Sequence, residues 1–111
     1  MQIVMTTGQN AMNISHEDHP DRTVVQVSGR LDTLHAKTFE TYVVDIIRDT
    51  SAQIVINMAG VSYVASSGLR SLLIAAKQMR AAGRDLLLSD LQPAVKEVFD
   101  ISGFSSIFRI V

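Results

Sequence analysis

The stretch Gln53-Ile54-Val55-Ile56-Asn57-Met58 decides the fold, together with the pattern that follows it. Its consecutive β-branched side chains are typical of a strand that is covered on both faces, so we expect this strand at the centre of a sheet. The next apolar side chains recur at helical spacing and predict a helix over residues 66–82, which Gly83 would end. The apolar face of this helix is formed by Leu69, Leu72, Leu73, Ala76 and Met79.

On the N-terminal side of this unit, residues 12–17 and 23–28 predict two strands of a hairpin around a polar break. A helix of about four turns is expected next, with Asp32 or Thr33 available as its N-cap. The first ten residues show no periodic pattern, so we expect them to form a loose tail or a short edge strand.

On the C-terminal side, Leu86-Leu87-Leu88 predicts another buried strand. A helix is expected from about Pro93 until Gly103, and a last strand within residues 104–110. Strands separated by single helices are expected to be parallel neighbours joined by right-handed crossovers. The sequence therefore predicts an α/β fold: a mixed sheet, mostly parallel with an N-terminal antiparallel hairpin, packed against helices.

Length and composition limit the classes of function. The 111 residues, 47% of them hydrophobic, can bury one sizeable core, so we expect residues 1–111 to form a single domain. A formal net charge of -1 makes nucleic acid an unexpected partner. The N-terminal segment lacks the pattern of a signal peptide and no apolar run reaches membrane-spanning length, so we expect a cytoplasmic chain without membrane insertion.

The sequence offers little for catalysis or metal binding. The absence of cysteine excludes a thiolate nucleophile and a Cys-ligated zinc site. His16 and His19 lie in the polar break without metal-ligand spacing, which favours a solvated turn, and His35 is expected to be exposed, although it could pair with Asp32. The glycines occur singly, so neither nucleotide-binding fingerprint is present. We therefore expect a protein that is not an enzyme and holds no metal or cofactor.

One segment, residues 57–70, has a position suited to recognition, because it leaves the buried strand and enters the second helix. Loops at the carboxyl ends of parallel strands are exposed, and a helix N-terminus has unpaired N–H groups that suit an anion. A phosphate on Ser66 or Ser67 would add nearly two negative charges there and could repel a partner. The simpler alternative is that either serine only caps the helix, and the pattern alone favours this alternative.

Several separated motifs resemble those of the anti-sigma factor antagonists, the STAS-domain family. Gly29-Arg30-Leu31-Asp32, followed by Ala36, is similar to the family's Gly-x-Leu-Asp…Ala loop, and Ser66-Ser67-Gly68-Leu69 is similar to its signature Asp-Ser-Ser/Thr-Gly-Leu. The resemblance covers nearly the whole chain, because further landmarks match Ile54-Val55-Ile56-Asn57, Val61-Ser62-Tyr63, Ala82-Gly83, Pro93-Ala94-Val95, Val98-Phe99 and Ser102-Gly103. It implies a mixed sheet packed against helices, as the periodicity does independently.

The resemblance also implies a partner cycle. The unphosphorylated antagonist binds an anti-sigma factor with a GHKL-type ATPase fold, which acts as a serine kinase, phosphorylates the antagonist and releases it. A metal-dependent serine phosphatase then resets the switch. The family's acceptor serine maps to Ser66, with Ser67 the less favoured neighbour, and Asp32 maps close to it. The contact residues implied are Asp32, Val64, Ala65, Ser66, Ser67, Gly68, Leu69 and Arg70.

One departure from the family pattern supports an alternative. Ala65 stands where the best-known members carry aspartate, which removes an acidic side chain beside the acceptor. The alternative is a constitutive STAS scaffold, of the kind that serves transport complexes, which binds its partner without phosphorylation and uses Ser66 only as a cap.

Overall fold

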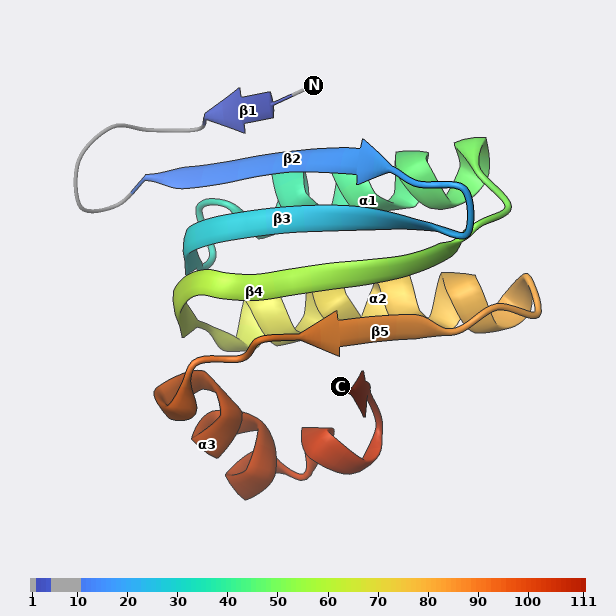
Figure 1. Cartoon of the computed structure of the whole chain (residues 1–111). Coiled ribbons are helices and arrows are strands. Elements are labelled where there is room, and N and C mark those ends of the chain that lie inside the picture. The colour runs from blue at the N-terminus through green and yellow to red at the C-terminus, as the bar shows by residue number, and fades with distance from the viewer. Residues whose placement is uncertain (1, 5–10) are drawn as a thin grey trace.

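The computed structural model describes residues 2–4 and 11–111, which form an α/β fold of strands and helices in alternation (Figure 1). The elements of this described part are β1 (Gln2–Val4), β2 (Met12–Asp18), β3 (Arg22–Leu31), α1 (Ala36–Asp49), β4 (Gln53–Val64), α2 (Ser66–Ala81), β5 (Leu86–Ser89), α3 (Pro93–Ser102), the short 3-10 helix η2 (Phe104–Ser106) and β6 (Arg109–Ile110).

The strands form one sheet in the order β1-β2-β3-β4-β5-β6. The pairs β1–β2 and β2–β3 are antiparallel, and the three pairs from β3 to β6 are parallel. The predicted mixed sheet is therefore confirmed, with β4 between β3 and β5. Residues 2–4 form an edge strand on β2, whereas residues 1 and 5–10 lie outside the described residues, so the expected loose tail is not tested there.

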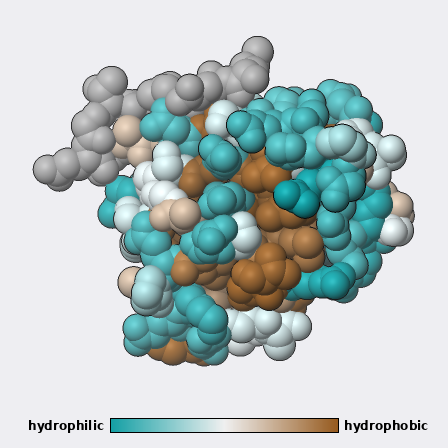
Figure 2. All heavy atoms as spheres, viewed as in Figure 1, coloured by the Kyte–Doolittle hydropathy of each residue, from teal (hydrophilic) through white to brown (hydrophobic). Residues whose placement is uncertain are grey.

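The core lies between one face of the sheet and helices α1 and α2, which cover that face together (Figure 1). The strands contribute alternate residues to it, as a strand with one covered face does. The fully buried side chains include Val25, Ile54, Ile56, Phe39, Val43, Leu72 and Met79. On the opposite face of β4, Val55 and Asn57 are only half-buried, so this strand is less covered on its second face than expected. Figure 2 shows this face, with apolar residues gathered near its middle.

Strand β4 is longer than the sequence indicated, because it continues to Val64. The pairing with β3 continues past two register shifts and ends with Leu31 beside Val64. A side chain at Gly60 would come within 2.6 Å of the Ser28 Cβ atom, so the absence of a side chain lets the two strands stay close. The expected loop after Asn57 is therefore mostly strand, and the turn into α2 is short.

The start of α1 also differs from the expectation. Neither the Asp32 nor the Thr33 side chain caps the helix, which has His35 in the N-cap position without a side-chain hydrogen bond. Instead, the Asp32 carbonyl accepts the N–H groups of His35 at 3.1 Å and Ala36 at 2.9 Å, which forms a turn before the helix. Backbone groups thus do what a capping side chain was expected to do.

The C-terminal part follows the prediction more closely. Gly83 and Gly103 adopt positive φ angles of 72° and 80°, as expected for glycines that end helices. The last strand is only Arg109–Ile110, because residues 104–106 form a 3-10 turn instead. Among the described helices, none is both long and apolar enough to cross a membrane.

Candidate functional site

The residues implied as contacts gather where two loops meet, at the carboxyl ends of β3 and β4. The Ala65 N–H donates a hydrogen bond of 3.0 Å to the Leu31 carbonyl, directly after the last pair of the two strands. Residues 32–35, which we name the switch loop, therefore run beside the N-terminus of α2. Asp32 and the serine stretch are close in the structure, as the family pattern implied.

Gly68 allows this close approach. A Cβ atom at this position would come within 2.3 Å of the Leu31 carbonyl oxygen and 2.9 Å of the Leu31 Cγ atom. Both distances are too short for real carbon contacts, and the backbone oxygen could move only if the strand moved. Gly68 thus lets the first turn of α2 pack directly on the end of β3.

The two serines at the start of α2 have different surroundings. Ser66 is exposed, and its hydroxyl makes no hydrogen bond within the described part of the chain. Ser67 is half-buried, and its hydroxyl lies 3.0 Å from the Thr33 hydroxyl of the switch loop. The N-cap position belongs to Ala65, so the interpretation of Ser66 or Ser67 as a simple N-cap is wrong.

The implied contact residues are not equally accessible. Ser66 and Arg70 are exposed, and Asp32, Ala65 and Ser67 are half-buried. The other three are buried and support the site from within: Val64, Gly68 and Leu69.

Sequence reasoning missed two apolar side chains near this point. Leu34 in the switch loop is 63% exposed, and Tyr63 at the end of β4 is 42% exposed. Leu34 lies outside the helical spacing of the first helix, which was a signal that it is not part of the core. Single exposed apolar side chains are common on protein surfaces, so it is the position of these two at the ends of β3 and β4 that makes them candidates for a contact surface.

A charged cluster supports the switch loop. The Arg30 Nε atom is 3.6 Å from Asp32 Oδ2, and the guanidinium carbon lies 4.1 Å from the centre of the Tyr63 ring. On the inner side, His35 Nδ1 lies 2.8 Å from Asp32 Oδ1 and 3.0 Å from the Arg30 carbonyl oxygen. The His35 side chain is fully buried beside Asp32, so its expected exposure is wrong and the alternative of a local pair with Asp32 agrees with the structure. The turn formed by the Asp32 carbonyl directs this side chain inward.

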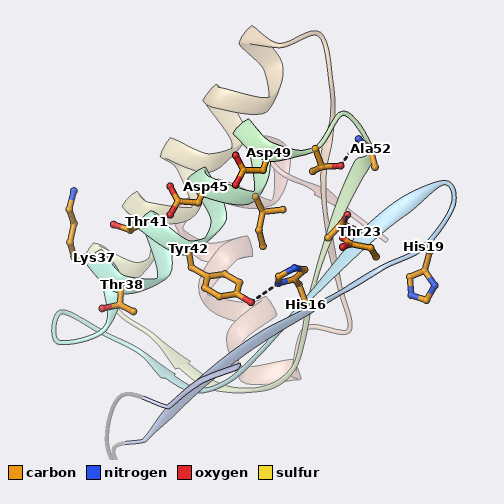
Figure 3. Close-up of a pocket in the computed structure, with 13 residues that line it drawn as sticks. His16, His19, Thr23, Lys37, Thr38, Thr41, Tyr42, Asp45, Asp49 and Ala52 are labelled. Atoms are coloured by element: carbon orange, nitrogen blue, oxygen red, sulfur yellow. Dashed lines mark hydrogen bonds between the residues drawn. The ribbon is translucent and has the colours of Figure 1, made fainter. Parts of the chain in front are cut away.

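A separate groove of about 640 Å³ lies between α1 and the β2–β3 hairpin (Figure 3). Its floor includes His16 and Tyr42, whose Nδ1 and hydroxyl oxygen are 2.6 Å apart, and the Thr23 hydroxyl donates to Asp18 at 3.0 Å. His16 is therefore half-buried and bonded to α1, rather than part of a solvated turn. None of the described groove residues is an implied contact residue, and no group of three potential metal ligands occurs within the described chain.

Burial raises the pKa of the Tyr42 hydroxyl above its usual value of 10, and the nearby Asp18 carboxylate raises it further. The chain has two tyrosines, so replacing Tyr63 by Phe isolates the titration of Tyr42. In that background Asp18→Asn is expected to lower the pKa of Tyr42, because the phenolate no longer faces a negative charge. The pKa is expected to stay above 10, since burial is the larger cause. Phenolate absorbance against pH measures both values, and an unchanged pKa in the Asp18→Asn variant would contradict this account.

Gly68→Ala tests the packing of α2 on β3, because helix propensity and steric contact predict opposite signs. Propensity alone would raise the free energy of unfolding by about 0.5–1 kcal/mol. The contact with Leu31 predicts a decrease of about 1–3 kcal/mol. Urea denaturation measures the difference, with the exposed Ser66→Ala as a control expected to stay within about 0.5 kcal/mol. A more stable Gly68→Ala variant would show that the close contact is absent.

Comparisons with known proteins agree with this geometry. Among solved structures, an anti-sigma factor antagonist from Mycobacterium paratuberculosis has a TM-score of 0.84 and 22% sequence identity, covering 95% of this chain and 89% of that chain. SpoIIAA in its unphosphorylated form has a TM-score of 0.74 and 21% identity, covering 88% and 87%. At these identities the likeness shows the fold alone.

Sequence relationships identify the family. BtrV of Bordetella bronchiseptica, described provisionally as an anti-sigma factor antagonist, is 34% identical over 84 residues, which make up 76% of this chain and 72% of that protein. Residues 13–111 match the STAS domain family model, a span that includes the switch loop and the whole of α2. The chain therefore belongs to the STAS domain family, among the anti-sigma factor antagonists.

Proposed function

We propose that this protein is an anti-sigma factor antagonist that binds an anti-sigma factor through the surface where the switch loop meets the N-terminus of α2. The observation that carries the proposal is the contact between these two segments, fixed by the Ala65–Leu31 hydrogen bond and by Gly68. Around this contact, hydroxyl groups, an acidic side chain and two exposed apolar side chains share one small area. Such a mixture suits a protein partner.

Phosphorylation of Ser66 is the proposed regulation of this surface. Ser66 is exposed at the start of a 16-residue helix whose first turn contains no acidic residue, so the partial positive charge of the helix end faces no carboxylate of that turn. A phosphate would be tolerated by the chain itself but would add nearly two negative charges to the surface that a partner covers. SpoIIAA, a protein of the same fold, has solved structures in unphosphorylated and phosphorylated forms, which supports a cycle of this kind.

The proposed cycle assigns the chemistry to other proteins. A serine kinase of the GHKL-type ATPase fold, which is also the anti-sigma factor, would transfer the phosphate, and a metal-dependent serine phosphatase would remove it. This chain would then act only by binding. The family supports this role, since anti-sigma factor antagonists are regulatory binding proteins.

A constitutive scaffold is the second candidate, and Ala65 is the observation that favours it. The N-cap of α2 has no side-chain oxygen, so an acidic group that a kinase could recognise beside Ser66 is missing. In this alternative the same surface would bind a partner permanently, as proposed for scaffold subunits of transport complexes. Only a phosphorylation assay separates the two candidates.

Incubation with the cognate kinase and ATP is expected to add one phosphate to the wild-type chain, none to Ser66→Ala and one to Ser67→Ala. The reason is that Ser66 is exposed, whereas Ser67 is half-buried against Thr33. Intact-mass spectrometry with peptide mapping measures the number and position of the phosphates. Ser66→Asp is expected to weaken binding to the anti-sigma factor by about tenfold or more, which calorimetry measures.

The possible results separate the hypotheses. A phosphate on the Ser66→Ala variant would show that the acceptor is another residue. Tight binding by a wild-type chain that no kinase modifies would favour the constitutive scaffold. If the wild-type chain is phosphorylated at Ser66 but Ser66→Asp binds with unchanged affinity, charge is not what releases the partner.

A further inference from the structure

His35 is a fully buried titratable side chain that the proposed binding surface does not use directly. Its Nδ1 atom lies 3.0 Å from the Arg30 carbonyl oxygen, at hydrogen-bonding distance, and 2.8 Å from Asp32 Oδ1. Asp32 Oδ1 is buried and has no hydrogen-bond partner within the described residues. The His35 Nε2 atom is also buried and has no hydrogen-bond partner in the described part of the chain. The two ring nitrogens therefore have opposite surroundings.

These surroundings determine where the ring carries its proton. Both neighbours of Nδ1 are acceptor oxygens, so an unprotonated Nδ1 would face them with its lone pair. A proton on Nε2 would instead be buried without an acceptor. The arrangement thus favours the tautomer with the proton on Nδ1 and none on Nε2.

We propose that His35 is a positioning residue of the switch loop: its Nδ1–H group donates to the Arg30 carbonyl, and the same edge of the ring faces Asp32 Oδ1. The ring lies 2.8 Å from the inner oxygen of the carboxylate, Oδ1, which is buried, while the Asp32 side chain as a whole remains 22% exposed. The outer oxygen is then the one available to Arg30 and to a partner. The Arg30 carbonyl belongs to the end of β3, so one buried side chain ties the switch loop to this strand and places its ring beside the acidic group of the loop. This inference rests on the proposed function only where it concerns the partner.

The first test needs no partner. Long-range ¹H–¹⁵N correlation NMR on the ¹⁵N-labelled wild-type chain distinguishes a protonated from an unprotonated ring nitrogen, and a His35→Asn sample assigns the signals by their loss. The expected result is that His35 carries its proton on Nδ1 and none on Nε2. A proton on Nε2 alone, or rapid exchange between both tautomers, would overturn the proposal.

Two substitutions then separate positioning from space filling. The amide nitrogen of asparagine reaches the place of Nδ1, whereas that of glutamine reaches the place of Nε2. Glutamine is closer to histidine in volume. If His35 only fills space, His35→Gln is therefore expected to be the milder change. If His35 acts through Nδ1, His35→Asn is expected to be the milder change, because only asparagine keeps a donor facing Arg30 and Asp32.

The backbone N–H groups of residues 35 and 36 bond to the Asp32 carbonyl, so their amide hydrogen exchange reports directly how stable the turn of the loop is. Exchange in His35→Asn is expected within about threefold of wild type, and in His35→Gln to be faster by about tenfold or more. Affinity for an anti-sigma factor that binds the wild-type chain is expected to follow the same order. Equal effects of both variants, or a milder effect of His35→Gln, would overturn the positioning role. If the loop follows the predicted order and no anti-sigma factor binds the wild-type chain, the proposed function fails and the positioning role stands.

Discussion

The hydrogen bond from the Ala65 N–H to the Leu31 carbonyl is the interaction on which the proposed contact surface depends. It joins the ends of two parallel strands at the point where both chains leave the sheet, and Gly68 packs on the same carbonyl. The Leu31 carbonyl accepts the Ala65 N–H and lies against Gly68, which has no side chain. The first turn of α2 can therefore come close to the switch loop. The Thr33–Ser67 contact forms only as a consequence of this approach.

The surface built on this contact has an inner and an outer part. Val64, Leu69 and His35 are buried and hold the loops, while Leu34 and Ser66 are exposed. A division of this kind lets a covalent charge change the outer part without disturbing the packing beneath it. The groove between α1 and the hairpin lies elsewhere and shares no described lining residue with the proposed contact surface, so the proposed switch does not require it.

Local signals were sufficient for most of the fold. Gly83 and Gly103 end helices because they tolerate positive φ, and the alternation of apolar runs predicted the order of strands and helices. The full length of β4 was not predictable, since it depends on register shifts against β3. The burial of His35 was missed for a similar reason: Asp32 was a foreseeable neighbour, but the Arg30 carbonyl and the buried position of the ring depend on the folded turn.

The most direct measurement of the central claim is hydrogen–deuterium exchange of the chain, free and bound to its anti-sigma factor. Exchange is expected to slow on binding in peptides that cover residues 30–35 and 63–70, since these two segments form the proposed contact surface. Peptides that line the groove on α1, residues 41–50, are expected to change little. Protection confined to α3 or to the α1 groove, with both predicted segments unchanged, would contradict the account.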